Sequence, residues 1–68
     1  MDEFGTEFPH AIGHVAKREL AARGYTRYEQ LTAATASDLL AIHGIGPKAI
    51  RILRDGLARR GLSFAGES

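Results

Sequence analysis

The sequence predicts an all-α protein, folded as one compact bundle of four main helices. Three observations support this fold class. Apolar residues recur every three or four positions in several segments, which is helical spacing. No segment alternates apolar and polar residues over the length of a strand, and the strongest turn signals fall between the helical runs. A chain of 68 residues is long enough for a single core only.

The two ends of the chain lack a sustained apolar period. Pro9 disfavours the helical conformation for Phe8 before it. We therefore expect residues 1–9 to form a flexible N-terminal arm, residues 10–64 to form the domain, and residues 65–68 to be a frayed tail. Two alternatives stay open for Phe4 and Phe8, which can dock on the core or on a second copy of the chain, and Phe64 can fold back onto the core.

The first helix is expected between about His10 and Arg23, with Gly24 as the residue that ends it. Gly13 falls in its first turns, where glycine is unfavourable. Either the helix begins later than His10, or Gly13 allows close packing or the approach of a ligand. The apolar side of this segment consists of Ile12, Val15, Ala16 and Leu20, and the opposite, solvated side of His14, Lys17, Arg18 and Arg23.

Two short helices are expected next, and each begins with a capping pattern. Thr26 followed by Glu29 has the form of a capping box, which predicts a helix to about Ala33. Thr35 followed by Asp38 repeats the pattern with Asp in the last place. We expect the third helix to run over about residues 36–42.

The last helix is expected to begin at Pro47, because proline suits the first helical position. It should end before Gly61, with Leu62 making the apolar contact of a Schellman motif. Its apolar stripe consists of Ala49, Ile50, Leu53 and Leu57, and basic residues occupy the other sides.

The basic residues are concentrated in the middle of the chain. The formal net charge is only +1, but residues 10–62 hold nine Lys and Arg against four Asp and Glu, an excess of five positive charges. Such an excess favours a polyanionic partner.

The segment Ile42-His43-Gly44-Ile45-Gly46-Pro47-Lys48-Ala49 predicts a tight hairpin between two helices. Glycine lets a foreign surface approach the main chain closely. Just inside the helix that follows, the amides of Lys48 and Ala49 are expected to point outward at the positive end of the helix dipole. With the Lys48 ammonium beside them, these groups suit an anion.

At this hairpin the sequence resembles the helix-hairpin-helix family of DNA-binding domains, a SAM-like bundle. The family pattern is an apolar residue, Gly, an apolar residue, Gly, any residue, a basic residue and a small residue, and Ile42 to Ala49 meets each place. The segment from Ile12 to Phe64 is also similar to the C-terminal domain of the bacterial RNA polymerase alpha subunit, notably in Tyr28-x-x-Leu31, Leu39-Leu40, Gly46-x-Lys48 and Leu57-Ala58-x-Arg60-Gly61-Leu62-Ser63.

The resemblance implies a free-standing relative that binds DNA through the hairpin and the first long helix. The family's hairpin contacts fall on Gly46, Lys48 and Ala49, the last in place of a common serine. The family's minor-groove arginine falls on Val15, and a neighbouring asparagine falls on Arg18. The departure at Val15 argues for contact with phosphates rather than base reading. The predicted DNA-binding residues are Gly44, Ile45, Gly46, Lys48, Ala49, Arg51 and Arg18.

No enzyme is expected, because no catalytic set is visible. The chain has no cysteine, and its acidic residues are scattered over helix starts and solvated faces. His10 and His14 stand four apart, but no third ligand is evident, so we expect no metal and no cofactor. No apolar run reaches the length of a membrane span, and a cytoplasmic protein is the default expectation.

Double-stranded DNA is the preferred partner, with RNA and single-stranded DNA as alternatives that a phosphate-binding loop does not distinguish. The rival function belongs to another class. In it the domain is a protein-interaction or self-associating module that uses exposed Phe4, Phe8 and Phe64.

Overall fold

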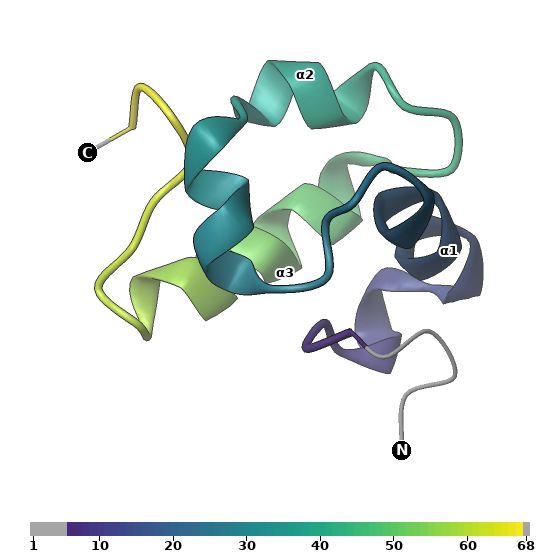
Figure 1. Ribbon diagram of the computed structural model, residues 1–68, viewed down its shortest axis with the longest axis horizontal. Helices are drawn as coiled ribbons and strands as arrows, with labels where there is room; N and C mark the ends of the chain where they lie inside the picture. Colours follow the sequence, from purple (N-terminus) through teal and green to yellow (C-terminus); the bar gives the residue numbers. More distant parts are fainter. Residues whose placement is uncertain (1–5, 68) are drawn as a thin grey trace.

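A computed structural model of the chain describes residues 6–67. The chain folds into three α-helices and two 3₁₀ helices in these residues (Figure 1). In chain order they are η1 (His10–Ile12), α1 (His14–Ala22), η2 (Tyr28–Ala33), α2 (Ala36–Leu40) and α3 (Pro47–Ala58).

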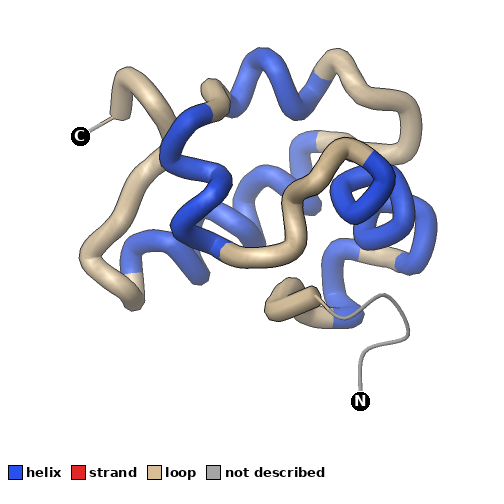
Figure 2. The backbone as a smooth tube through the Cα atoms, viewed as in Figure 1, coloured by secondary structure: helices blue, strands red, loops and turns tan. Residues whose placement is uncertain are grey.

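Within the described residues there are helices and loops and no strand (Figure 2), which confirms the all-α fold class. α3 runs through the middle of the bundle and contacts η1, η2 and α2. Its inward face consists of buried residues that include Ile50, Leu53 and Leu57. These apolar groups follow the spacing predicted from the sequence.

The helix expected over residues 10–23 is interrupted at Gly13, which has a φ of +95°. This left-handed backbone separates η1 from α1, so the long helix begins later than His10. Its end is as predicted, because Gly24 has a φ of +86°. Lys17 lies in α1 but is buried, contrary to its expected place on the solvated side. The apolar stem of a lysine allows such a buried position.

The two middle helices differ in how well their caps were predicted. Thr35 and Asp38 form the expected capping box, with the Asp38 amide donating to Thr35 Oγ1 at 3.0 Å and the Thr35 amide donating to Asp38 Oδ2 at 3.2 Å. The first box is wrong in detail. Gln30, rather than Glu29, accepts from the Thr26 amide at 2.7 Å, and the helix it begins is 3₁₀.

The expected flexible arm does not describe residues 6–9, which belong to the fold. The side chain of Phe8 is 1% exposed and meets the ring of Tyr28 edge-on, with centroids 5.2 Å apart. The Glu7 amide donates to Thr26 O at 2.8 Å, and Glu7 Oε1 accepts from the Tyr28 amide at 2.9 Å. These contacts join segments about twenty residues apart, and no local pattern reveals them.

The expected frayed tail is likewise held in place as far as Glu67. The Ala65 amide donates to Ala34 O at 2.9 Å, and Glu67 pairs with Arg54 on α3. Upstream of these contacts, Gly61 has a φ of +71° and the Leu62 amide donates to Leu57 O at 2.8 Å, as the predicted helix end requires.

Phe8 and Phe64 do not form the exposed surface expected for self-association. Phe8 and Phe64 are each 1% exposed and belong to the core. Phe4 lies outside the described residues. Burying the two rings stabilises the fold through their large apolar area, which leaves neither ring for a partner.

Candidate nucleic-acid interface

The predicted hairpin is the connection between α2 and α3. Gly44 turns the chain with a φ of +93°, and the Ile45 amide closes the turn on Ile42 O at 3.1 Å. The side chain of Ile45 is 4% exposed and packs in the core. The buried side chain of Ile45 therefore fixes the hairpin to the core, while Gly44 remains exposed at its tip.

α1 approaches the hairpin at Gly44. A Cβ placed there would overlap Cγ1 of Val15 on α1, so the contact requires glycine. Val15 itself is 38% exposed. The contact places the first turns of α1 beside the hairpin.

Gly46 has a different role. Its φ of −107° and ψ of −178° are extended backbone, which other residues can adopt, and no atom lies within 4 Å of a Cβ built there. The space above Gly46 is open. The absence of a side chain therefore leaves the main chain accessible without being needed for the fold.

The start of α3 presents unbonded main-chain donors. Gly46 is the N-cap residue and supplies no side-chain acceptor, and Pro47 has no N–H. The first amide to find an acceptor is that of Ile50, which donates to Gly46 O at 3.1 Å. In the described part of the chain, the amides of Lys48 and Ala49 have no intramolecular acceptor. They carry the positive end of the α3 dipole.

Two exposed cations flank these amides. Lys48 and Arg51 are exposed on α3, three residues apart and hence on neighbouring positions of one face. Over residues 6–67, neither side chain makes an ion pair or a hydrogen bond. Arg23, Arg54 and Arg59 differ, because each pairs with a carboxylate at 2.7 to 2.9 Å.

The side chains of Ile45 and Ala49 are buried, at 4% and 5% exposed. They were both among the predicted contact residues. These two residues can contact a ligand only through their main chain, because their side chains are packed in the core. Lys48 and Arg51 are the predicted hairpin residues whose charged side chains are exposed.

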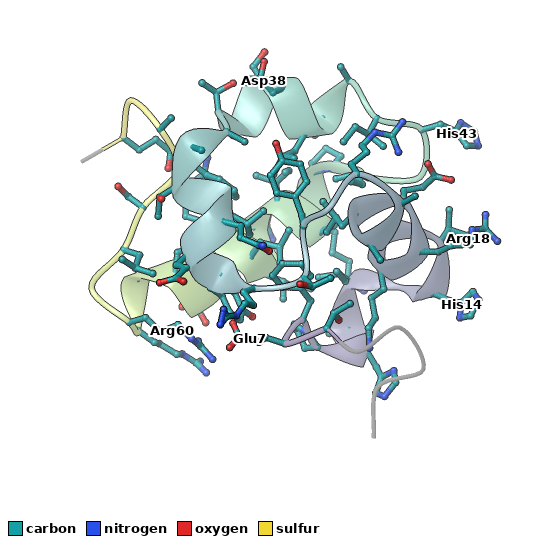
Figure 3. All side chains as sticks on the ribbon, viewed as in Figure 1. Glu7, His14, Arg18, Asp38, His43 and Arg60 are labelled. Atoms are coloured by element: carbon teal, nitrogen blue, oxygen red, sulfur yellow. The ribbon has the colours of Figure 1, made fainter. Side chains whose placement is uncertain are left out.

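Arg18 lies on α1, and in Figure 3 it projects toward the same side as His14 and His43. The guanidinium is 3.8 Å from the carboxylate of Glu19. Arg23 binds that same carboxylate at 2.7 Å and, with smaller contributions from Arg18 and His43, lowers the pKa of Glu19. Glu19 was not predicted to belong here. Its negative charge reduces what Arg18 contributes to anion binding.

A separate shallow cavity of about 250 Å³ is lined by residues from the N-terminal segment, η2 and the end of α3: Glu7, Arg27, Tyr28, Glu29, Arg60 and Leu62. Arg60 stacks on the ring of Tyr28, 4.0 Å from its centroid, and donates to Gly56 O at 2.9 Å. Burial raises the pKa of Tyr28. The cavity carries as many carboxylates as guanidiniums, and none of its residues belongs to the hairpin.

Within residues 6–67, no group of three or more His, Asp or Glu is arranged to hold a metal ion. No helix in this range has the length and apolar character needed to cross a membrane.

Comparisons of the chain with protein-family models, with curated proteins and with solved structures found no match.

Proposed function

We propose that this protein is a small DNA-binding module of helix-hairpin-helix type that holds the phosphate backbone of duplex DNA, largely independently of base sequence. The observation that carries the proposal is one coincidence at the start of α3. The outward amides of Lys48 and Ala49 lie beside two exposed cations, Lys48 and Arg51, with which no carboxylate of residues 6–67 forms an ion pair. A turn that only connected two helices would not need these features together.

The strength of binding follows from the number of phosphate contacts, which is small for one hairpin. We expect a dissociation constant of about 10⁻⁴ to 10⁻⁶ M at physiological salt, as for non-specific DNA binding in general. Arg18 adds a weaker contribution, because Glu19 lies 3.8 Å from it. Phosphate contacts set the position of a protein on DNA and carry little sequence information.

Reversing the two free cations should abolish most of this binding. We expect Lys48→Glu with Arg51→Glu to weaken binding of a fluorescent duplex about tenfold or more at low salt, because two phosphate contacts become repulsive. The measurement is fluorescence anisotropy at two salt concentrations. The matched control, Arg27→Glu with Arg59→Glu, makes the same change in charge at exposed residues outside the hairpin.

If both double variants lose affinity equally, general charge rather than the hairpin explains binding, and the proposal fails. A parallel titration with single-stranded DNA and with RNA tests the choice of duplex. Tighter binding of either competitor would replace duplex DNA as the partner.

Gly46→Val separates main-chain contact from folding. Because Gly46 is extended and open, we expect the variant to lose no more than about 1 kcal/mol of stability, mainly because valine is a poorer N-cap residue than glycine. Its side chain would nevertheless cover the amides, so DNA affinity should fall severalfold. Circular dichroism checks the fold, and anisotropy checks binding. Full affinity in a folded Gly46→Val protein would show that DNA does not approach the main chain here.

A further inference from the structure

The chain returns along α3 after that helix ends. Residues 62–67, which we call the C-terminal segment, run back past η2 and are drawn in yellow in Figure 1. Phe64 fixes the segment in the core, and the Ala65 amide binds Ala34 O at 2.9 Å. The Glu67 amide then donates to Phe64 O at 3.1 Å, which turns the end of the segment toward α3.

The carboxylate of Glu67 accepts two hydrogen bonds from the guanidinium of Arg54. Arg54 Nε donates to Glu67 Oε1 at 3.0 Å, and Arg54 Nη2 donates to Glu67 Oε2 at 2.7 Å. The guanidinium also lies 5.7 Å from the centre of the Phe64 ring. The hydrogen bonds lower the pKa of Glu67 and raise that of Arg54. Both side chains keep solvent access, at 50% and 30% exposed.

Arg54 continues the row of cations at the hairpin. It follows Arg51 by three residues on α3, as Arg51 follows Lys48, so neighbouring side chains in the row lie one helical turn apart. Arg51 and Lys48 have no carboxylate partner within residues 6–67, and Arg54 has one. The row therefore presents two open cations and a third that is occupied.

The Glu67 carboxylate, which occupies Arg54, resembles a DNA phosphate in its chemistry. A carboxylate that takes both donors of a guanidinium presents two oxygens in the same fork that a phosphate presents. An ion pair this exposed is weak, since water and salt screen it. A DNA phosphate can therefore replace Glu67 with little loss.

We propose that Arg54 is a third phosphate contact of the DNA-binding surface, and that Glu67 competes with DNA for it as a built-in phosphate mimic. This inference rests on the proposed function. In the free protein Glu67 holds Arg54 in an ion pair, which lowers the affinity for DNA. Any event that moves Glu67 away from α3 extends the surface by one cation.

The test is Glu67→Gln in the full chain, titrated with the same fluorescent duplex. We expect affinity at low salt to rise about two- to fivefold, the range set by the strength of an exposed ion pair. The plot of log affinity against log salt should steepen by up to about 0.9, the value of one phosphate contact. Circular dichroism should show an unchanged fold, because Glu67 is exposed.

The matched control is Glu29→Gln, which removes the same charge from a side chain that is 75% exposed on η2. Equal gains from the two variants would overturn the inference, since net charge alone would explain them. In an Arg54→Gln background, Glu67→Gln should lose its effect. A persistent gain there would also overturn it.

The failures of the two proposals are distinguishable. If Lys48→Glu with Arg51→Glu weakens binding but Glu67→Gln changes nothing, only the inference about Arg54 fails. If that double variant leaves binding unchanged, the proposed function fails and the inference fails with it.

Discussion

Phe8→Ala is expected to lower the free energy of unfolding by about 3–5 kcal/mol, the usual cost of truncating a buried phenylalanine. Phe8 is 1% exposed, and its ring contacts that of Tyr28 edge-on. A domain of this size has a total stability of only several kcal/mol, so the variant should be largely unfolded at room temperature. Urea denaturation followed by circular dichroism measures the effect.

The control for this prediction is Leu40→Ala. Leu40 is 44% exposed on α2, so its truncation should cost less than about 1 kcal/mol. Phe8→Leu, which keeps most of the apolar volume, should recover a folded protein. A loss below about 1 kcal/mol for Phe8→Ala would mean that residues 6–9 are not part of the core in solution.

Gly56→Val is expected to destabilise the domain by about 3 kcal/mol, at the upper end of what overpacking costs. A Cβ on Gly56 would lie 2.6 Å from Cε1 and Oη of Tyr28. The ring has little room to move, because Phe8 packs on it and Arg60 stacks over it at 4.0 Å. The free energy of unfolding from urea denaturation gives the size of the effect.

Gly56→Ala makes this prediction sharp, because helix propensity and packing act in opposite directions. Propensity alone would stabilise the alanine variant by about 1 kcal/mol. We expect the clash with Tyr28 to reverse that sign. Gly46→Val serves as the control, since a Cβ at that position meets no atom within 4 Å. A stabilised Gly56→Ala protein would contradict close packing of the Tyr28 ring on α3.

Much of the fold follows from local sequence patterns. α3 begins at Pro47 and carries its apolar residues inward, as the spacing predicts. The cap formed by Thr35 and Asp38 is present, and the chain turns at Gly61. Each of these features depends on residues within a few positions of one another, where backbone geometry dictates which groups can meet.

The candidate site was also predictable in part. The spacing of Gly44, Gly46 and Lys48 located the hairpin, and the open amides at the start of α3 follow from the geometry of any helix N-terminus. Sequence did not distinguish the two glycines. Gly44 is required by its positive φ and by Val15, whereas Gly46 adopts ordinary extended backbone.

The pairing of charges could not be predicted, because exposed arginines choose among several carboxylates of similar local spacing. The carboxylate of Glu19 lies 2.7 Å from the guanidinium of Arg23 and 3.8 Å from that of Arg18. Glu67 reaches Arg54 across thirteen residues. The tertiary fold decides which carboxylates lie near which arginines. It thus decides which cations remain available to an anion.

By itself the sequence determined the helical class, the position of the hairpin and the basic character of its surroundings, since all three depend on local spacing and composition. Only the tertiary structure decided that Phe8 and Phe64 lie in the core, and that within residues 6–67 Arg54 has a carboxylate partner while Lys48 and Arg51 have none. The physical reason is one of range. Burial and ion pairing depend on contacts between segments that are distant in the sequence, such as those that α3 makes with η1, η2 and α2.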